Sequence, residues 1–267
     1  MWGPATLLVG ATALLYTLAA ILHLVAVLRR EVERWAGWLT RSGWITQTGA
    51  LLLLGVTGRL RLTSLLDFTL LFCWLLMTAY VGLSVWMRSE AAGSFVLPVV
   101  ASALVLSLGV GEHVGQVDGL SGGFLLWHVG VAMIAYVCLF IASVVGALYL
   151  VQEGNLRRKR WGRLYYRMPS LEDLDNWAVR FAWLGHPLLT LTMISGLIQA
   201  HGLWLFSDPK IFFTGLLWLL WGGYLLMRHL RGWGGRRAAW VSLAGLVGIL
   251  ANWFLINLLS AGHRFGL

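Results

Sequence analysis

The seven histidines of this chain are the residues best suited to chemistry, because a neutral imidazole can bind a metal ion or exchange a proton. Their spacing matches none of the usual zinc patterns. No HExxH pair is present, and the two cysteines, Cys73 and Cys138, form no CxxC pair. Both cysteines lie inside apolar runs, so we expect neither a disulfide framework nor a thiol-exchange site.

Two of the histidines are accompanied by aromatic residues. The stretch "LLWHVGVAMIAY" places His128 near the start of an apolar run, with Tyr136 eight residues further on along roughly the same helical face, and "NLLSAGHRFG" places His263 at the end of the last run. Between them lies "AHGLWLFSDPK", which contains Trp204, Phe206 and Asp208. Two imidazoles beside an aromatic platform suit a non-covalently bound, b-type haem with His128 and His263 as axial ligands of the iron. The structural alternative is that each imidazole only hydrogen-bonds a neighbour between helices.

Composition indicates the elements that must position these residues. Of 267 residues, 59% are hydrophobic and 12% are charged, against about 25% charged in an ordinary globular protein. A soluble protein of this size could not cover its surface with so few charges. The chain is therefore predicted to be an integral membrane protein in contact with lipid.

Runs of about 20 apolar residues predict membrane-spanning helices. The sequence contains eight such runs, near 5–28, 42–58, 64–87, 94–110, 124–151, 178–200, 211–228 and 238–260. The second run is short and polar, with Gln47 near its middle. The first has no basic leader and no small-residue cleavage site after it, so we expect a spanning helix rather than a signal peptide. The predicted fold is all-α, a bundle of about eight transmembrane helices in a single integral membrane domain, 1–267.

The distribution of positive charge sets the orientation. If the N-terminus is outside, the inner loops carry 16 of the 20 basic residues, counting Arg180 at the edge of one loop; these loops are 29–41, 88–93, 152–177 and 228–237. Because cytoplasmic loops collect Lys and Arg, we expect both termini outside and a multi-pass protein of a bacterial inner membrane. The same rule explains the net charge of +9 without a nucleic-acid partner.

This orientation sorts the histidines into two levels. Those at or beyond the outer boundary are His113, His128, His201 and His263. Those in the inner half or at its edge are His23, His186 and His229. Two levels are what two metal or porphyrin sites, one above the other, would produce, and ionisable residues inside a membrane mark functional sites by default.

The order of these features resembles the cytochrome c assembly superfamily of haem-handling membrane proteins, which includes CcsA, CcmC and HemX-like proteins. The resemblance is strongest over 124–267. It is carried by six pieces in order: "GRLRLTSLLDFTLLFCWLL", "WHVGVAMIAYVCLFIASVVGALYLVQE", "MPSLEDLDNWAVRFAWLGHPLLTLTMISG", "SDPKIFFTGLLWLLWGGYLL", "RGWGGRRAAW" and "NLLSAGH".

The resemblance implies that His128 and His263 ligate haem on either side of an outer, tryptophan-rich segment. Here that segment is 201–210, and its tryptophans are thinned to Trp204, with Leu205 and Ser207 at positions that are usually aromatic. HemX-like proteins show a similar thinning, so the chain is placed closest to that branch. Cytochrome c synthase activity by this chain alone is not expected.

The family's inner haem site is altered in this sequence. Its histidine in the second helix corresponds to Gln47, and the one in the seventh helix aligns near Met227, two residues before His229. His23 and His186 lie at a compatible depth, and methionine can also ligate haem iron. A rearranged inner site and an empty one both remain open.

Two functions follow from the resemblance. The first is an assembly factor, rather than an enzyme, that presents haem at the outer face for cytochrome c assembly, with a second assembly subunit or apocytochrome c as partner. The alternative is a HemX-like regulator of tetrapyrrole biosynthesis that acts through loop 152–177 on a soluble protein. In that loop, the ordinary explanation of "SLEDLD" is that Ser170 caps a helix with Glu172 and Asp173 in its first turn. A transporter is a third alternative, because Pro98 and Pro187 interrupt apolar runs as in the broken helices of transporters. The two halves of the sequence, however, show no repeat of each other.

Overall fold

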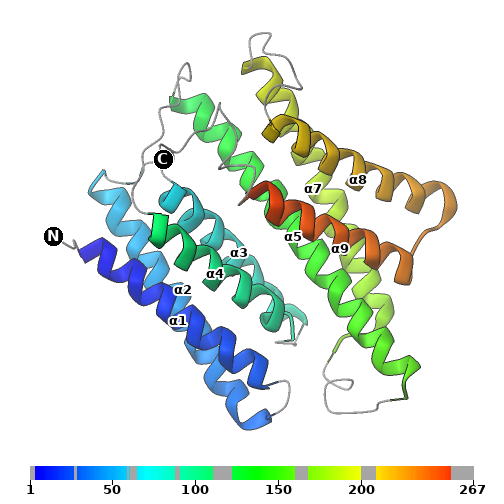
Figure 1. Ribbon diagram of the computed structural model, residues 1–267, viewed down its shortest axis with the longest axis horizontal. Helices are drawn as coiled ribbons and strands as arrows, with labels where there is room; N and C mark the ends of the chain where they lie inside the picture. Colours follow the sequence, from blue (N-terminus) through cyan, green and yellow to red (C-terminus); the bar gives the residue numbers. More distant parts are fainter. Residues whose placement is uncertain are drawn as a thin grey trace. The chain divides into compact units, whose positions relative to one another are not determined.

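The computed structural model describes residues 4–26, 29–58, 60, 65–87, 91–110, 122–159, 168–199 and 209–253. Within these ranges the chain forms eight α-helices and one short 3-10 helix, and it contains no strand. The described residues fall into two compact units, one within Met1–Gly115 and the other within Gln116–Phe265 (Figure 1). Each unit is described by itself, and the single domain predicted for 1–267 stays a prediction.

Unit 1 is built around its first helix. Helix α1 (Pro4–Ala26) packs along α2 (Glu33–Val56) and against α4 (Gly93–Val110), and α3 (Leu65–Met87) contacts α2 and α4. The short η1 (Arg30–Val32) precedes α2. Tyr16 of α1 is completely buried against α2 at Gly43, where an added Cβ would come within 2.7 Å of the Tyr16 ring. The missing side chain at Gly43 therefore allows the aromatic ring to fit between the two helices.

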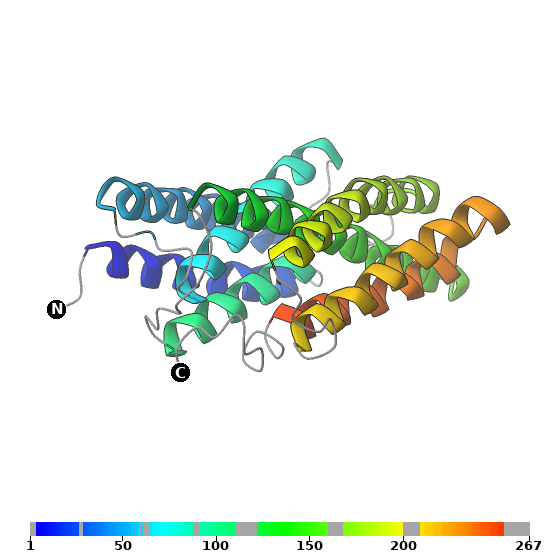
Figure 2. The ribbon, with the colours of Figure 1, turned by 90° about the horizontal axis from the view of Figure 1, so that it is seen from above.

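Unit 2 is built around a helix longer than a bilayer core. Helix α5 (Gly122–Arg157) has 36 residues, about 54 Å against roughly 30 Å of hydrocarbon. Helices α7 (Leu171–Gln199) and α9 (Gly235–Ala251) pack on α5, and α8 (Pro209–Arg231) contacts α7 and α9. Figure 2 shows α8 and α9 running alongside each other. The inner end of α5 consequently extends beyond the apolar layer.

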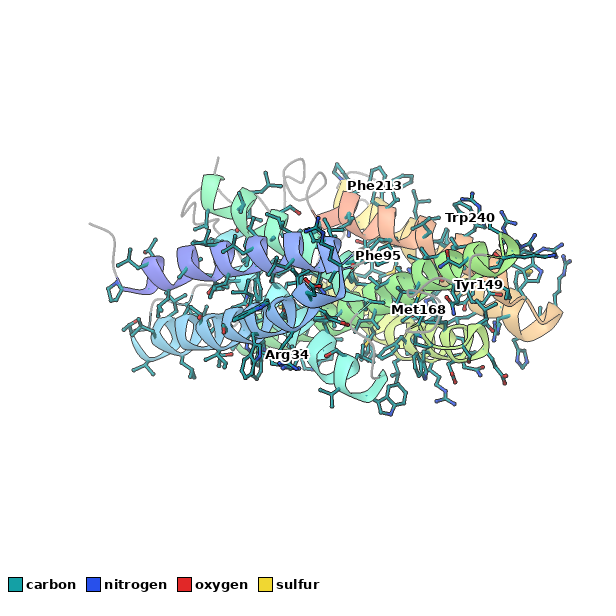
Figure 3. The ribbon with its side chains drawn as sticks, turned by 90° about the horizontal axis from the view of Figure 1, so that it is seen from below. Arg34, Phe95, Tyr149, Met168, Phe213 and Trp240 are labelled. Carbon is teal, nitrogen blue, oxygen red and sulfur yellow. The ribbon has the colours of Figure 1, made fainter. Side chains whose placement is uncertain are left out.

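The chain is a multi-pass membrane protein. Among the described residues, five helices are long and apolar enough to cross a bilayer, namely α1, α3, α5, α7 and α8, and α4 is a shorter apolar helix. In the part of the chain that the structure describes, Trp183 is exposed in the middle of α7, whereas four other tryptophans that are more than half exposed lie near the helix ends that the charge distribution predicts to be inside: Trp35, Trp38, Trp86 and Trp240, the last labelled in Figure 3. Tryptophan concentrates at membrane–water interfaces, so these positions fit an interfacial belt.

The eight predicted runs correspond one to one, in order, with the eight helices. The predicted start of the second helix is wrong, because α2 begins at Glu33 rather than near residue 42, and most of the predicted inner loop 29–41 is helical. Its first turns alternate exposed Arg34 and Arg41 with buried Ala36 and Thr40. A search for continuous apolar residues misses such an amphipathic turn. For the same reason, the predicted runs leave out the charged last turns of α5 and the charged first turns of α7.

Helix α7 begins with the cap that the sequence predicts. The backbone N–H of Asp173 donates to the Ser170 hydroxyl at 3.1 Å, and this hydroxyl donates to the Asp173 carboxylate at 2.6 Å. Glu172 and Asp173 lie in the first turn, where the helix dipole favours negative charge. The acidic stretch "SLEDLD" thus has a confirmed structural role at a helix N-terminus.

The turn between α8 and α9 is held by one carboxylate of α7. Arg228 donates to Asp175 Oδ2 at 2.6 Å and to the carbonyl of Trp233 at 3.1 Å, and the backbone N–H of Gly235 donates to Asp175 Oδ1 at 2.8 Å. Gly235 has a φ of 60°, a left-handed conformation that glycine adopts without strain. The glycines of "RGWGGRR" therefore form a specific turn that joins three helices.

Candidate functional site

His128 lies six residues after the first residue of α5, at the end of unit 2 that the charge distribution predicts to be outside. Its Nδ1 is 2.6 Å from the hydroxyl oxygen of Ser195, which lies four residues before the end of α7. The imidazole also lies beside Gly196, where an added Cβ would be 3.6 Å from the ring carbon Cε1. The histidine is therefore held on α7 through one ring nitrogen.

Anchoring through Nδ1 suits an axial ligand of a metal. Histidines that ligate metals almost always use one ring nitrogen for the metal and hydrogen-bond the other to a fixed partner. His128 contacts Ser195 through Nδ1, and a metal bound in this way would use Nε2. The side chain and its environment thus fit a haem ligand. Next to it, the side chain of Trp127 is half-exposed.

Tyr136 belongs to a different polar contact. The Asn252 amide nitrogen donates to the Tyr136 hydroxyl at 2.6 Å and to the Thr214 hydroxyl at 3.3 Å, so the cluster joins α5, α8 and the end of α9. Tyr136 lies about 12 Å further along the helix axis than His128, eight residues at 1.5 Å each. Its hydroxyl is hydrogen-bonded to the scaffold, and its predicted place in the haem site stays a prediction.

His23, an inner candidate, is enclosed within unit 1. It is 3% exposed, and its Nε2 is 3.2 Å from the hydroxyl of Thr40 on α2. The ring meets Tyr80 of α3 edge to face with centroids 6.4 Å apart. An added Cβ on Gly93 of α4 would come within 2.6 Å of Nδ1. The histidine is consequently packed by three neighbouring helices.

Gln47, which the resemblance placed at the position of an inner histidine, is also part of the packing of unit 1. The side chain is fully buried, accepts a hydrogen bond from the Tyr16 hydroxyl at 2.7 Å and donates to the carbonyl of Leu70 at 3.0 Å. Its amide therefore links α1, α2 and α3. These contacts explain why a polar residue is retained in the middle of a membrane helix.

The other inner candidates lie in unit 2. His186 of α7 stacks on Trp218 of α8, with ring centroids 5.4 Å apart, and its Nδ1 is buried without a hydrogen-bond partner. His229 is exposed in the last turn of α8, and Met227 is partly buried two residues earlier. His186 packs against Gly222, more than one helical turn before Met227. The contacts of His186 with Trp218 and Gly222 do not include the other candidates, and the predicted roles of all of them stay predictions.

Several predicted site residues lie outside the described residues. They are His263, Trp204, Phe206 and Asp208, together with His113 and His201. Among the residues that are described, no group of three or more His, Cys, Asp or Glu side chains could hold a metal ion. The outer site is therefore represented in the structure by His128 and its anchor.

Sequence reasoning missed Ser195, Asn252 and Thr214. A serine or threonine in an apolar helix commonly bonds its own backbone, so neither residue type nor spacing singles it out. The pairing of Ser195 in "TMISG" with His128 in "WHVG" depends on how α7 is aligned along α5. That alignment cannot be read from the sequence and is shown only by the structure.

Comparison with known proteins places the chain in a family. The family model described as cytochrome C assembly protein matches residues 62–263, which run from just before α3 to His263. The chain is similar to the cytochrome c biogenesis protein CcsA of Synechococcus, with 33% identity over 175 residues, which cover 56% of each protein, just over half of that relative.

Two further relatives match over a longer region. The cytochrome c biogenesis protein CcsA of Gloeobacter violaceus is 25% identical over 252 residues, covering 73% of this chain and 75% of that protein. The CcsA of Guillardia theta is 29% identical over 217 residues, covering 72% of each. No solved structure matches the chain significantly. Since the family match covers residues 62–263, well over half of the chain and all the described residues of unit 2, the chain belongs to the cytochrome c assembly protein family.

Proposed function

We propose that this protein binds haem non-covalently at the outer face of a bacterial inner membrane and presents it for cytochrome c assembly. The observation that carries the proposal is the anchored His128. Its Nδ1 lies 2.6 Å from Ser195, so Nε2 can take an axial position on iron. Family membership, and relatives named for cytochrome c biogenesis, support the same role.

His263 is the proposed second ligand, and Trp204, Phe206 and Asp208 are proposed to form the edge of the site. The described residues support this arrangement indirectly. Asn252, which the Tyr136 hydroxyl holds at the end of α9, precedes His263 by eleven residues. Tyr136 thus fixes the point from which the segment carrying His263 departs.

Exposed aromatic side chains lie next to His128 in the sequence and near the start of α8. Trp127 is 47% exposed, and Phe213 of α8 is 40% exposed and visible at the surface in Figure 3. A porphyrin is large, flat and apolar, so exposed aromatic side chains of this kind suit it. When bound, haem would supply iron redox chemistry and its vinyl groups, while the chain would set its ligation, orientation and access.

We assign no catalytic group to this chain. Attachment of haem to a cytochrome would take place on a partner, either a second assembly subunit or apocytochrome c. For the inner site, His186 keeps a buried ring nitrogen without a hydrogen-bond partner, whereas His23 is bonded to Thr40. Of the inner candidates His23, His186, His229 and Met227, His186 is therefore the best-supported ligand.

The test is a spectrum of the full chain purified in detergent, with haem added. We expect a Soret band of low-spin, histidine-ligated haem that is lost or strongly shifted in His128→Ala and in His263→Ala. Ser143→Ala, which removes a fully buried hydroxyl bonded to the carbonyl of Leu139 within α5, is the matched control and should leave the spectrum unchanged. A spectrum that is the same in the double variant His128→Ala/His263→Ala would overturn the proposal.

The regulatory alternative makes a different prediction. If the chain acts through loop 152–177 on tetrapyrrole synthesis, replacing residues 160–167 with an unrelated basic linker would change the abundance of a soluble biosynthetic enzyme in cells while haem binding persists. The assembly role predicts that the same replacement leaves enzyme abundance unchanged. The two roles are therefore separated by one variant with two measurements.

A further inference from the structure

Helix α9 has one buried face and one exposed face. The buried face packs on α5, where Ser242 lies against Gly146, and on α8, where Gly245 lies against Trp221. The opposite face carries exposed residues that recur every three or four positions and therefore form one stripe along the helix. In order from the end that the charge distribution predicts to be inside, they are Arg236, Arg237, Trp240, Ala244 and Val247.

The polarity of this stripe changes in the same order as the layers of a membrane leaflet. The side chain of Arg236 is 52% exposed, Trp240 is 53% exposed and Val247 is 65% exposed. At 1.5 Å per residue, Trp240 lies about 6 Å and Val247 about 16 Å further along the helix than Arg236. The headgroup layer of a bilayer is roughly 5–7 Å thick on each side of the hydrocarbon, and tryptophan concentrates at the boundary between them. The stripe therefore runs from headgroup level to hydrocarbon.

The predicted inner end of unit 2 carries an excess of positive charge. Its described residues, within 152–180 and 228–237, include four acidic side chains, Glu153, Glu172, Asp173 and Asp175. They include eight basic side chains, so the formal net charge of these residues is 8 − 4 = +4. The basic residues are Arg157, Arg158, Lys159, Arg180, Arg228, Arg231, Arg236 and Arg237. An anionic partner complements such a surface.

The carboxylates near α9 are already engaged by other groups. Asp175 accepts from Arg228 and from the backbone of Gly235. Glu153 pairs with Arg157 at 2.8 Å, whereas its distance to Arg236 is 3.8 Å. An exposed ion pair of that length contributes little, so Arg236 is available to another anion.

Arg237 is more accessible still. It is exposed, and it forms no ion pair with any residue that the structure describes. The planar guanidinium group of arginine offers two parallel donors that match the oxygens of a phosphate group. Two adjacent arginines above an interfacial tryptophan therefore suit a phosphate at the level of the lipid headgroups.

We propose that the exposed stripe of α9 binds an anionic phospholipid of the leaflet on the predicted inner side, with the phosphate held by Arg236 and Arg237. The glycerol region lies beside Trp240, which Figure 3 labels, and an acyl chain follows the helix past Ala244 and Val247. Charge complementarity selects an anionic lipid over a zwitterionic one, because the choline group of a zwitterionic lipid cancels the phosphate charge. The site is independent of haem.

The first experiment measures the headgroup preference of the full chain. Delipidated protein in neutral detergent is mixed with equal amounts of phosphatidylglycerol and phosphatidylcholine that have the same acyl chains, and native mass spectrometry gives the ratio of the two bound lipids. Arg237→Gln removes one charge and breaks no ion pair among the described residues. Arg34→Gln is the matched control, because Arg34 is an exposed arginine in the first turn of α2, at the same predicted side of the membrane but next to Glu33.

We expect the unmodified chain to prefer phosphatidylglycerol and Arg237→Gln to lower this preference about fivefold, the typical contribution of one basic residue at an anionic lipid surface. Arg237→Lys keeps the charge and should retain most of the preference. Arg34→Gln should leave the ratio nearly unchanged. Equal losses in Arg237→Gln and Arg34→Gln would show a diffuse charge effect and would overturn the proposal, as would the absence of any preference in the unmodified chain.

A second measurement locates the lipid in the unmodified chain and needs no variant. Phosphatidylglycerol with a photoreactive diazirine in one acyl chain is added to the protein in phosphatidylcholine vesicles, and the cross-linked peptides are sequenced. We expect cross-links on residues 240–247, with much weaker labelling of the same residues by phosphatidylcholine that carries the same diazirine. Equal labelling of α9 by the two lipids, or phosphatidylglycerol cross-links only outside α9, would overturn the proposal.

Discussion

Asn252 and Tyr136, which are 116 residues apart in sequence, are joined by a hydrogen bond of 2.6 Å from the asparagine amide to the tyrosine hydroxyl. Tyr136 lies in α5, and Asn252 directly follows the last residue of α9. Asn252 is only 4% exposed, so water cannot readily replace this hydrogen bond. The position at which the chain leaves α9 is thus fixed by a residue of α5.

Tyr136→Phe tests this link. Removing the hydroxyl leaves Asn252 with its longer bond to Thr214, so we expect the free energy of unfolding to fall by about 0.6 kcal/mol, the average for hydrogen bonds between membrane helices, and by no more than about 1.7 kcal/mol. Tyr224→Phe is the matched control, because the Tyr224 hydroxyl is buried without a hydrogen-bond partner. Thermal unfolding in detergent should show a lower midpoint only for the first variant. Equal midpoints would contradict the structural role of the bond.

The number and order of the helices could be predicted because the thickness of a membrane imposes a length and composition on each span. The start of α2 could not, since Arg34 and Arg41 are interspersed with buried small residues and leave no continuous apolar run. At the site, His128 stands out by residue type alone. Its partner Ser195 does not, because the pairing depends on the register of α5 against α7, which no local pattern records.

Tyr136 illustrates a second limit. Spacing from His128 placed it near the same helical face and predicted a contact with haem. Its hydroxyl is bonded to Thr214 of α8 and to Asn252 at the end of α9, and only the three-dimensional packing brings those partners within reach; the contact with haem stays a prediction. Polar residues in membrane helices attract functional interpretations, yet interhelical hydrogen bonding explains many of them.

Gln47→Leu tests the same distinction in unit 1. The substitution removes two buried hydrogen bonds and leaves the Tyr16 hydroxyl, which is 0% exposed, without its acceptor, so we expect a loss of about 1–3 kcal/mol in unfolding free energy. The haem spectrum should not change. In a double-mutant cycle with Tyr16→Phe, the double variant should lose less unfolding free energy than the sum of the two single losses, because both substitutions remove the same hydrogen bond. Full additivity in the cycle would argue against the Tyr16–Gln47 contact.

Gly245→Ala tests the packing of α9 on α8. An added Cβ would come within 2.6 Å of the indole of Trp221, a completely buried side chain, and we expect a cost of about 1–3 kcal/mol for overpacking. Gly223→Ala, in α8, has nothing within 4 Å of the added Cβ and should stabilise the helix by up to about 1 kcal/mol. Chemical denaturation in detergent should therefore give opposite signs for the two glycines. Equal tolerance of both substitutions would mean that Trp221 does not occupy this seam.

Asp175→Asn tests the inner turn that joins α7, α8 and α9. The carboxylate is 20% exposed and accepts bonds from Arg228 and from the backbone of Gly235, so the amide would weaken a charged contact and present a donor to the Arg228 guanidinium. We expect the free energy of unfolding to fall by about 1.5–3 kcal/mol, typical of a hydrogen bond to a charged group. Glu172→Gln, an exposed carboxylate one turn earlier, should change it little. Because the turn lies at the opposite end of unit 2 from His128, haem affinity measured by titration should be the same in both variants. A loss of haem affinity in Asp175→Asn while the chain remains folded would show that the inner turn and the outer site are coupled through the helices between them.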